Sequence, residues 1–524
     1  MKKIFIAIFV TLAAVALTSC SQDLLNIQQK GAVGQEEFYQ NDDDALAAIT
    51  AVYAQMNSYY YNYKFFSNLP SDNIYCGGGS RGDNDQWAQL NEFRTHAQTG
   101  SLSSYYRGAY NIIFKCNLLI NNMEPNTAVT KRAIAEARFF RAWAHMVLTE
   151  FWGTPPLITE VLVGDEKPAN TPKAELWKFI IDEFGACASD LPSKSNKNDK
   201  NAVCRITKEC ALAHQGKAQV LSGDYAGAKS TLKKVIDSGL YDLVPSSEYD
   251  NIQSKEGDLS PEVVMAIHVT ENGTNTYTND MLYLMWGWRT DHLTCVPNGF
   301  YNNSWGFMNP TKDFFDAFVA HDGPNSTRIR ASVASWEQVL QMDFTGKPKF
   351  KTINPVHGNE GYFDMKFRYR DQNAVKARNG YSYINDRMYM RYAEVLLLYA
   401  EACAQSGDGD GSGLKALNKI QERAGAPITP LTLQNVKDEK RFELYLEGCR
   451  FVDLVRWGDA PKALAGHYEK IPEFTLDENG NASVTWNPYN TGKTHGYQAG
   501  KNEVYPFPYS ELQVNENLVQ NPGY

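Results

Sequence analysis

Apolar residues recur at helical spacing in the segment RYAEVLLLYAEA, residues 391–402. The positions i, i+3, i+4, i+7 and i+10 are taken by Ala393, Leu396, Leu397, Ala400 and Cys403. Because an α-helix completes a turn every 3.6 residues, this spacing places all of these side chains on one face. The pattern predicts a helix with one buried side.

The same arrangement occurs a second time in the chain. KAQVLSGD at 217–224 aligns with EACAQSGD at 401–408, and each is followed by a second helical stretch, at 226–237 and 414–423. A helix, a glycine-containing turn and a second helix are typical of tetratricopeptide-like pairs. The two units are not in tandem at a fixed period. We therefore expect an interrupted helical scaffold and not a regular solenoid.

Helical patterns also dominate the first 240 residues. Three aspartates at 42–44 offset the helix dipole at the start of a helix that runs through Tyr53. Gly153, Pro155 and Pro156 end another helix, because proline cannot continue the hydrogen-bond ladder. The predicted helical stretches are 105–122, 129–151, 173–190, 207–222 and 224–238.

The pattern changes between about residues 241 and 385. Helical periodicity largely disappears, residues 262–269 predict a strand, and Gly, Asn and aromatic residues dominate 281–308. Long loops in compact proteins commonly carry function, and this aromatic content argues against disorder. At the end of the chain, the Pro-rich segment 505–512 and residues 520–524 are predicted to be extended.

Composition narrows the class of protein. The 524 residues are 43% hydrophobic and 21% charged, as in a globular protein with a sizeable core. The net charge is -9 and no Lys/Arg-rich stretch follows the first three residues, so nucleic acid is not an expected partner. Aromatic residues make up 12% of the chain, which suits hydrated polar ligands as well as cores.

The N-terminus has the pattern of a targeting segment. A basic start, Met1-Lys2-Lys3, precedes a short apolar stretch at 4–17, too short to span a membrane. The stretch ends in Leu17-Thr18-Ser19-Cys20, which resembles a lipobox. We predict a signal peptide at 1–19 and lipidation of Cys20, where several acyl chains would hold the protein firmly on a membrane. The alternative is an ordinary secretory signal.

Several fragments resemble enzyme or metal motifs and lack the required context. GGSRG at 78–82 fits the nucleophile-elbow formula, but no hydrophobic strand and helix flank it. DGDGSG at 408–413 begins like a calcium loop, yet its twelfth position is Lys419, a cation. No CxxC pair exists, and Cys116, Cys187, Cys403 and Cys449 lie in helical patterns as small apolar residues. Disulfide pairing and a structural metal stay open; no catalytic residue, metal ligand or cofactor is predicted.

Five separated motifs, in order, carry a family resemblance. They are the lipobox, the central string AEARFFRAWAHMVLTEFWGTPPL at 135–157, the helix at 391–402, the strings LNKIQERAG and KRFELYLEGCRFVDLVRWG at 417–425 and 440–458, and the Pro-rich ending. Together they resemble the SusD/RagB family of surface nutrient-binding lipoproteins of Gram-negative gut bacteria. The resemblance implies a mainly α fold of tetratricopeptide-like helix pairs with a loop-rich insert of short strands.

The resemblance also implies a function. Family members bind glycans at the outer membrane and act as the lid of a SusC-like TonB-dependent β-barrel transporter, without catalysis. We expect one domain with a helical part at 20–240, a ligand-binding insert at 241–385 and a helical part with an extended tail at 386–524. The alternatives are a peptide-capturing RagB-like protein, a helical-repeat interaction protein with no small ligand and, more distantly, a hydrolase.

Aromatic and polar residues in two loop regions are the candidate ligand contacts. Flat rings stack on the apolar faces of sugars, while Asn, Asp and Arg bond the hydroxyl rims, each ring adding on the order of 1 kcal/mol. The candidates are Asp72, Asn73, Tyr75, Trp87, Trp286, Trp288, Tyr301, Asn302, Trp305 and Arg368. Core packing is the alternative for each, and it is the preferred interpretation for Trp143, Trp152, Trp177 and Trp457. The identity of the glycan stays open, with the modest Lys/Arg content favouring a neutral polymer.

Overall fold

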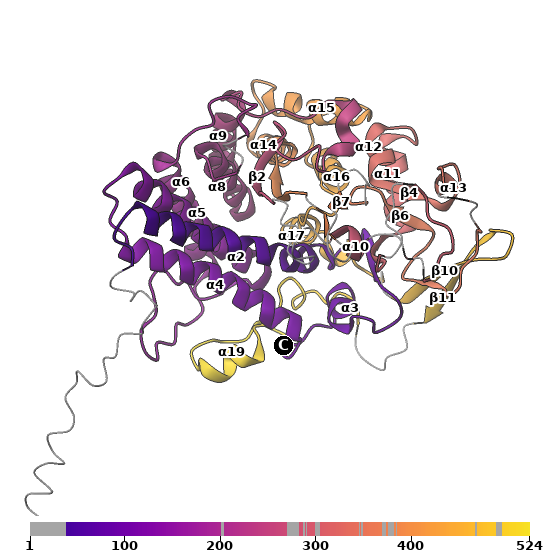
Figure 1. Ribbon diagram of the computed structural model, residues 1–524, viewed down its shortest axis with the longest axis horizontal. Helices are drawn as coiled ribbons and strands as arrows, with labels where there is room; N and C mark the ends of the chain where they lie inside the picture. Colours follow the sequence, from indigo (N-terminus) through magenta and orange to yellow (C-terminus); the bar gives the residue numbers. More distant parts are fainter. Residues whose placement is uncertain are drawn as a thin grey trace, which may run out of the picture.

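The computed structural model describes residues 38–200, 204–269, 282–286, 289, 291–298, 304–344, 346, 349–368, 374–375, 382–383, 385–466, 469–488 and 495–524. The predictions for Cys20, Trp288, Tyr301 and Asn302 lie outside these residues. Figure 1 shows long helices of the N-terminal part on one side, short strands on the other, and α14 to α17 between them.

Six helices form the N-terminal part, in close agreement with the predicted stretches. They are α2 (Asp42–Asn68), α4 (Gly100–Asn122), α5 (Ala128–Trp152), α6 (Lys173–Asp190), α8 (Lys208–Ser222) and α9 (Tyr225–Asp237). Each of α4, α5, α6, α8 and α9 packs on the next in that order. Thr127 caps α5 with a capping box, and Gly153, at φ +78°, ends it where the sequence predicted.

The two sequence-matched helix pairs lie against each other. α8 and α9 form one pair, α14 (Tyr392–Ser406) and α15 (Ser412–Ala424) form the other, and α9 packs on α14. Glycine allows close contact within each pair: a Cβ on Gly216 would collide with Leu232, and one on Gly413 with Cys403. The predicted tetratricopeptide-like scaffold, mainly helical, is confirmed.

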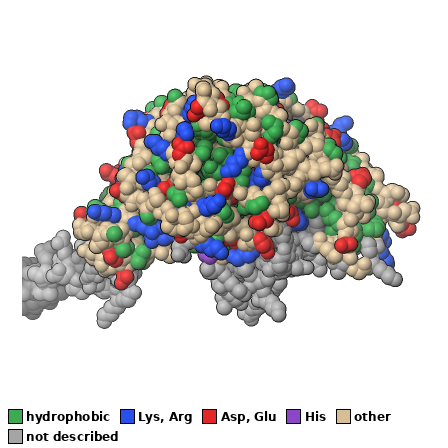
Figure 2. All heavy atoms as spheres, turned by 90° about the horizontal axis from the view of Figure 1, so that it is seen from above, with side chains coloured by type: hydrophobic (Ala, Val, Ile, Leu, Met, Phe, Trp, Pro, Cys, Tyr) green, Lys and Arg blue, Asp and Glu red, His purple; other side chains and the backbone are tan. Residues whose placement is uncertain are grey.

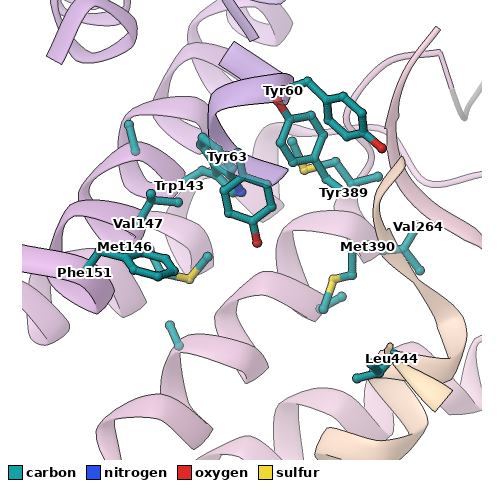
Figure 3. Close-up of a cluster of buried hydrophobic side chains, with 14 of the residues drawn as sticks. Tyr60, Tyr63, Trp143, Met146, Val147, Phe151, Val264, Tyr389, Met390 and Leu444 are labelled. Carbon is teal, nitrogen blue, oxygen red and sulfur yellow. The ribbon is translucent and has the colours of Figure 1, made fainter. Parts of the chain in front are cut away.

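One apolar core joins the helices to the strand side. Figure 3 shows Tyr60 and Tyr63 of α2 beside Trp143 of α5 and Tyr389 of β9 (Arg387–Arg391). The rings of Tyr60 and Tyr389 meet edge to face, with centroids 5.1 Å apart. Trp143, Trp152 and Trp177 are buried, as predicted, whereas Trp457 is half-buried.

The strands are short and come in small antiparallel sheets. β1 (Ile74–Gly77) pairs with β3 (Phe307–Pro310), β2 (Val263–Ile267) with β9, and β4 (Val333–Ser335) with β6 (Tyr362–Asp364). β10 (Lys470–Leu476) lies between β11 (Ala482–Pro488) and β5 (Val356–His357), and β7 (Ala374–Val375) pairs with β8 (Ser382–Tyr383). The strand expected at 262–269 is confirmed as β2, while the β10–β11 hairpin was not predicted.

Shorter helices complete the fold. They are α3 (Asp85–Asn91), η2 (Ser246–Asn251), α10 (Leu282–Trp286), α11 (Lys312–Asp322), α12 (Thr327–Ser332), α13 (Trp336–Val339), α16 (Leu433–Glu443), α17 (Arg450–Arg456), α18 (Ala460–Ala463) and α19 (Tyr509–Val514).

Two of these short helices differ from the expectations. α11 interrupts the loop-rich insert, because Thr311 caps it and Phe314 and Phe318, one turn apart, are buried. The prediction of an extended chain over 505–512 was wrong from Tyr509 onward, where α19 begins after Pro508.

A buried ion-pair network holds β9 to the C-terminal helices. Arg391, fully buried, pairs with Glu262, with Glu443 at 3.0 Å and with Glu447 at 2.5 Å. Burial by itself would raise the pKa of Glu443, but the surrounding arginines more than offset burial and hold the pKa well below its usual range. The network therefore carries compensated charges through the centre of the protein.

Candidate functional site

The two loop regions predicted to carry ligand contacts meet in the structure. Tyr75 of β1 lies opposite Asn309 of β3, and Gly77 lies opposite Phe307. Past the ladder, the Gly78 N–H donates to the Gly306 carbonyl at 2.9 Å. Gly77 has φ +73°, and a Cβ there would collide with the Gly306 carbonyl oxygen. Only glycine therefore permits this approach of the two loops.

Arg289 ties the two loops together. Its guanidinium donates to the Trp305 carbonyl at 2.6 Å and to the Asp291 carboxylate at 2.8 Å, and lies 3.7 Å from the Asp83 carboxylate. Asp83 in turn accepts from the Gly79 N–H at 2.7 Å. His292 adds a second tie, with its Nε2 atom 3.0 Å from the Gly79 carbonyl oxygen. Arg289 and His292 were not predicted site residues; charged side chains inside the aromatic loop were the available signal.

Trp305 and Trp286 have opposite environments. Trp305 is 39% exposed, and its backbone N–H donates to the Leu284 carbonyl at 2.6 Å, which fixes the backbone that carries the ring. Trp286 is only 4% exposed, and its ring meets Phe367 edge to face at 4.7 Å. Of these two candidates, Trp305 alone presents its ring to solvent.

Trp87 and Tyr75 lie beneath the loops. The half-buried Trp87 stacks on Phe65 of α2, with ring centroids 3.8 Å apart, and its indole N–H donates to the Tyr105 hydroxyl at 3.2 Å. Tyr75 is 5% exposed. Their contacts support the loops from below.

Asp72 and Asn73 connect β1 to the C-terminal helices. The Asp72 carboxylate takes two hydrogen bonds from Arg450, at 2.7 and 2.8 Å, and the Asn73 side-chain oxygen accepts from Arg441 at 2.8 Å. Burial would lower the pKa of Arg450, but the Asp72 carboxylate more than offsets this and raises it. These buried polar groups are satisfied within the protein and fix the position of β1.

Arg368 is bound by an acidic neighbour. Its guanidinium forms a bidentate ion pair with Asp250 and also donates to the Met365 carbonyl at 2.8 Å. These bonds give Arg368 a structural role within the protein, and its contact with a ligand stays a prediction.

The surface around the loops is shallow. A cavity of only about 10 Å³ lies between β1, the following loop and β5; its lining includes Tyr75, Arg81, Asn91, His357 and Ile471. Such a space holds about one water molecule. A sugar would therefore not enter this crevice.

The hairpin β10–β11 presents another exposed indole beside these loops. Trp486 of β11 is 44% exposed, and its ring meets Tyr75 edge to face, with centroids 6.5 Å apart. The sequence analysis missed it because the hairpin was assigned to a helical part with an extended tail. The alternation of polar residues around Val484 and Trp486 was the signal that could have found the strand.

A larger groove, about 620 Å³, lies between α4, the 156–168 segment and α19. Its lining includes Phe114, which is 51% exposed, Leu162, 43% exposed, and Val514, 67% exposed. Apolar side chains gathered in this way are typical of surfaces that contact another protein.

Other sites were sought among the described residues. There, no cluster of three or more His, Cys, Asp and Glu side chains has the arrangement of a metal site. No helix within the described ranges has both the length and the apolar character needed to cross a membrane. All eight cysteines other than Cys20 are present as thiols.

Family models match both halves of the chain. The SusD family matches residues 261–524, and a family described as starch-binding, associating with the outer membrane, matches residues 34–218.

Individual relatives extend the match over most of the chain. The starch-binding protein SusD of Bacteroides thetaiotaomicron is 26% identical and covers 80% of this chain and 78% of its own. A SusD-like protein of Bacteroides ovatus is 25% identical and covers 85% of this chain and 81% of its own.

Solved structures have the same fold. A laminarin-binding SusD-like protein, 24% identical, superimposes with a TM-score of 0.76 over 93% of this chain and 100% of its own. Surface glycan-binding protein A of Bacteroides thetaiotaomicron, in complex with laminarihexaose, is 20% identical and gives 0.71 over 92% of this chain and 99% of its own. The family models, the relatives and the shared fold lead to one conclusion: this chain belongs to the SusD family.

Proposed function

We propose that the protein binds an oligosaccharide or polysaccharide on the surface formed by the loop at 77–84 and the described residues 289, 291–298 and 304–306. The observation that carries the proposal is the exposed Trp305 ring beside Arg289, Asp83 and Asp291. The names of the relatives support it, since they include starch-binding and laminarin-binding proteins.

The chemistry of this surface fits a sugar ligand. The Trp305 indole offers a flat apolar face, and the neighbouring carboxylates and guanidinium can bond hydroxyl groups. Asp83 and Asp291 are both exposed, so their remaining acceptor positions face solvent. No chemistry beyond binding is required, and we propose a binding protein and not an enzyme.

The charge pattern favours a neutral glycan. Beside Trp305 the guanidinium of Arg289 pairs with the carboxylates of Asp83 and Asp291. The face of the molecule in Figure 2 likewise mixes basic and acidic side chains, without a field of one sign. The chain as a whole carries a net charge of -9. A polyanionic ligand would be repelled at long range by this charge.

We further propose that a lipid on Cys20 holds the protein on the outer surface of the outer membrane, where it hands the glycan to a SusC-like TonB-dependent β-barrel transporter as its lid. The side of the molecule where the described residues begin supports this. The Thr127 hydroxyl donates to Asp42 at 2.5 Å, which places the start of α2 beside the start of α5, and both helices pack on α4. The apolar groove with Phe114 and Val514 lies along that same helix and suits a protein partner.

Lid action would be a shift between open and closed states. A glycan can close such a lid only to the extent that it binds the closed state more tightly. The scaffold of packed helix pairs would move as a body and carry the ligand loops with it.

The test is affinity electrophoresis with the chain from residue 21 onward, which keeps every described residue. Gels would contain starch, laminarin or another neutral polymer, or an acidic polysaccharide. We expect retardation by at least one neutral glycan and its loss in Trp305→Ala, with Tyr509→Ala, an aromatic 46% exposed on α19, as the matched control. If no glycan retards the wild-type protein relative to a gel without glycan, the proposal is rejected and peptides become the next ligands to test.

A further inference from the structure

Two tryptophans stand apart from the others by exposure. Of the nine that the structure describes, Trp305 and Trp486 are exposed, and the other seven are buried or half-buried. A single exposed apolar residue is ordinary and needs no explanation. Here, however, both exposed indoles lie beside the same structural unit, β1 and the loop that follows it.

The backbone of Gly358 lies between the Trp486 strand pair and β1. In the β10–β11 ladder it lies opposite Pro472, whose carbonyl accepts the Gly358 N–H at 2.8 Å. Gly358 has φ +60°, and a Cβ there would lie 2.9 Å from the Gly77 nitrogen and 3.4 Å from the Tyr75 Cβ. Because Gly358 carries no side chain, nothing rises from it between the Trp486 strand and β1.

Trp305 lies just before β3, next to the Gly77 end of the β1–β3 ladder. Tyr75, which meets the Trp486 ring, pairs with Asn309, and Trp305 precedes Asn309 by four positions. At the rise of a β-strand these four positions span about 13 Å. This length is an upper bound, because Gly306, at φ +72°, interrupts the extended chain. The Trp486 ring contacts the Tyr75 end of the β1–β3 pairing and Trp305 follows its Gly77 end, so a ligand that reaches both indoles is a run of sugar units and not a single sugar.

The surface between the two indoles is polar. The loop after β1 exposes Ser80, Arg81 and Asp83 to solvent, and the Arg81 guanidinium is held by both carboxylate oxygens of Glu92. Hydroxyl, guanidinium and carboxylate groups there can bond the rims of sugar rings whose faces lie on the indoles at either end. The crevice beneath this loop is too small to admit a sugar, so the ligand would lie across the loop.

We propose that Trp486 is a second aromatic platform, and that the ligand is a glycan chain lying across the 77–83 loop from Trp305 to Trp486. This inference rests on the proposed function, and it adds a length requirement: the surface recognises a run of sugars and not a chain end or a single unit. Two platforms joined through one ligand gain affinity because the second contact is intramolecular.

The edge position of β11 offers a rival role for Trp486. β11 lies at the end of its three-stranded sheet in the described part of the chain, and an extended peptide could pair with such an edge. The glycan platform is favoured because the Trp486 ring contacts the ligand loop through Tyr75, whereas strand pairing would use backbone groups and need no indole.

The test is calorimetry with oligosaccharides of increasing length, cut from the polymer that retards the wild-type protein. We expect wild-type affinity to rise with length up to the chain that spans both rings. Trp486→Ala should lose that rise, by roughly three- to tenfold for long chains, and bind the shortest ligand like wild type. Thr485→Ala, exposed on the same strand, should behave as wild type throughout. Trp305→Ala should weaken binding at every length.

The outcomes separate the two proposals. If Trp486→Ala equals wild type at all lengths while Trp305→Ala loses binding, the second platform is rejected and the proposed function stands. If Trp486→Ala instead abolishes capture of an extended peptide and leaves glycan affinity intact, the edge-strand role replaces it. If no glycan binds the wild type, both proposals fail. Far-UV circular dichroism establishes that each variant is folded, and Trp486→Phe, which keeps a ring, should retain most of the length dependence.

Discussion

The loop surface formed by Trp305, Arg289, Asp291 and Asp83 is called the rim here. It and the core around Trp286 both carry a tryptophan and differ in what surrounds that ring. The two tryptophans are nineteen positions apart, in one aromatic stretch. Trp286 lies among Phe367 and Phe65, which come from distant parts of the chain, whereas Trp305 is fixed through its backbone by Leu284 and Arg289. A tryptophan whose ring packs on other rings belongs to the core. A tryptophan whose backbone is hydrogen-bonded while its ring faces solvent can contact a ligand.

Replacing each tryptophan by alanine gives the largest expected contrast. Trp286→Ala should lower the free energy of unfolding by about 3–5 kcal/mol, because it empties a packed site. Trp305→Ala should change it by no more than about 0.5 kcal/mol, as an exposed substitution, while reducing glycan retention. Urea unfolding followed by far-UV circular dichroism, together with affinity gels, measures both effects. Equal destabilisation by the two variants would show that the Trp305 ring is packed.

The glycines of the loop after β1 allow a matched test of how closely the two loops approach. Gly77→Ala should cost about 2–4 kcal/mol, from a left-handed backbone at φ +73° and a collision with the Gly306 carbonyl. Gly82→Ala shares the positive φ, at +92°, but no heavy atom lies within 4 Å of the added methyl group, so about 1–2 kcal/mol is expected. The difference between the two losses of unfolding free energy measures the cost of the collision with the Gly306 carbonyl.

Gly77→Ala should also weaken glycan binding more than Gly82→Ala does, since it displaces the residue next to Trp305, whereas Gly82→Ala only adds a methyl group to the loop surface. Unfolding curves and affinity gels on both variants provide the measurement. If the two glycines cost the same, the approach of the loops contributes nothing to stability.

The sequence predicted the scaffold better than the rim, and particular residues show why. The helix at 391–402 depends on spacing within a dozen residues, and so it could be found from sequence alone. The strand β2 was found for the same reason. The burial of Trp286 depends on Phe367, and the role of Asp72 depends on Arg450, 378 residues away. No local pattern contains those partners.

The ligand site stays a prediction, but the structure shows which of its candidate residues lie together. Both loop regions were identified, and the structure brings them together at β1 and β3. Aromatic composition did not separate the supporting Trp87 from the exposed Trp305, and the hairpin carrying Trp486 was missed because its β10 strand pairs with the distant β5. Exposure is a tertiary property that a list of aromatic residues does not contain.

The response to pH should differ between scaffold and rim. Burial, together with the charge of Asp386, raises the pKa of Asp258 to about 7. Since the folded state binds this proton more tightly than the unfolded chain, the stability it contributes is lost as pH rises towards and through 7. Between pH 5 and 8 the contribution of Asp258 to the free energy of unfolding should fall by about 2–3 kcal/mol. Burial lowers the pKa of His145 to about 4 and of His214 to about 3, and these two groups offset part of the fall, because the unfolded chain loses their protons as pH rises from 5.

Asp258→Asn should reduce that slope without removing it, because burial also raises the pKa of Glu150 to about 7 and of Asp364 to about 6. Glycan affinity should stay constant over the same range. Burial alone would raise the pKa of Asp291 at the rim, but the neighbouring His292 and Arg289 side chains more than offset burial and lower it, so this carboxylate stays ionised. Urea unfolding and calorimetry at pH 5, 6, 7 and 8 separate the two responses. A slope that Asp258→Asn leaves unchanged would assign the pH dependence to other groups.

Arg289 tests whether the rim is a preformed surface. Its three hydrogen bonds, to the Trp305 carbonyl, to Asp291 and to His292, fix the loop that carries Trp305, and its guanidinium lies 3.7 Å from the Asp83 carboxylate of the other loop. Arg289→Ala should reduce glycan affinity on the order of tenfold, the equivalent of losing one charged hydrogen bond, with little loss of global stability. Arg289→Lys keeps the charge but cannot form the same fork, so an intermediate affinity is expected. Hydrogen exchange of the Gly78 and Gly79 amides would report the loosening directly, because both are hydrogen-bonded within this arrangement. If affinity falls while these amides stay protected, Arg289 acts by touching the sugar; if exchange rises with the loss of affinity, the rim binds because it is held ready by a side chain that need not meet the ligand at all.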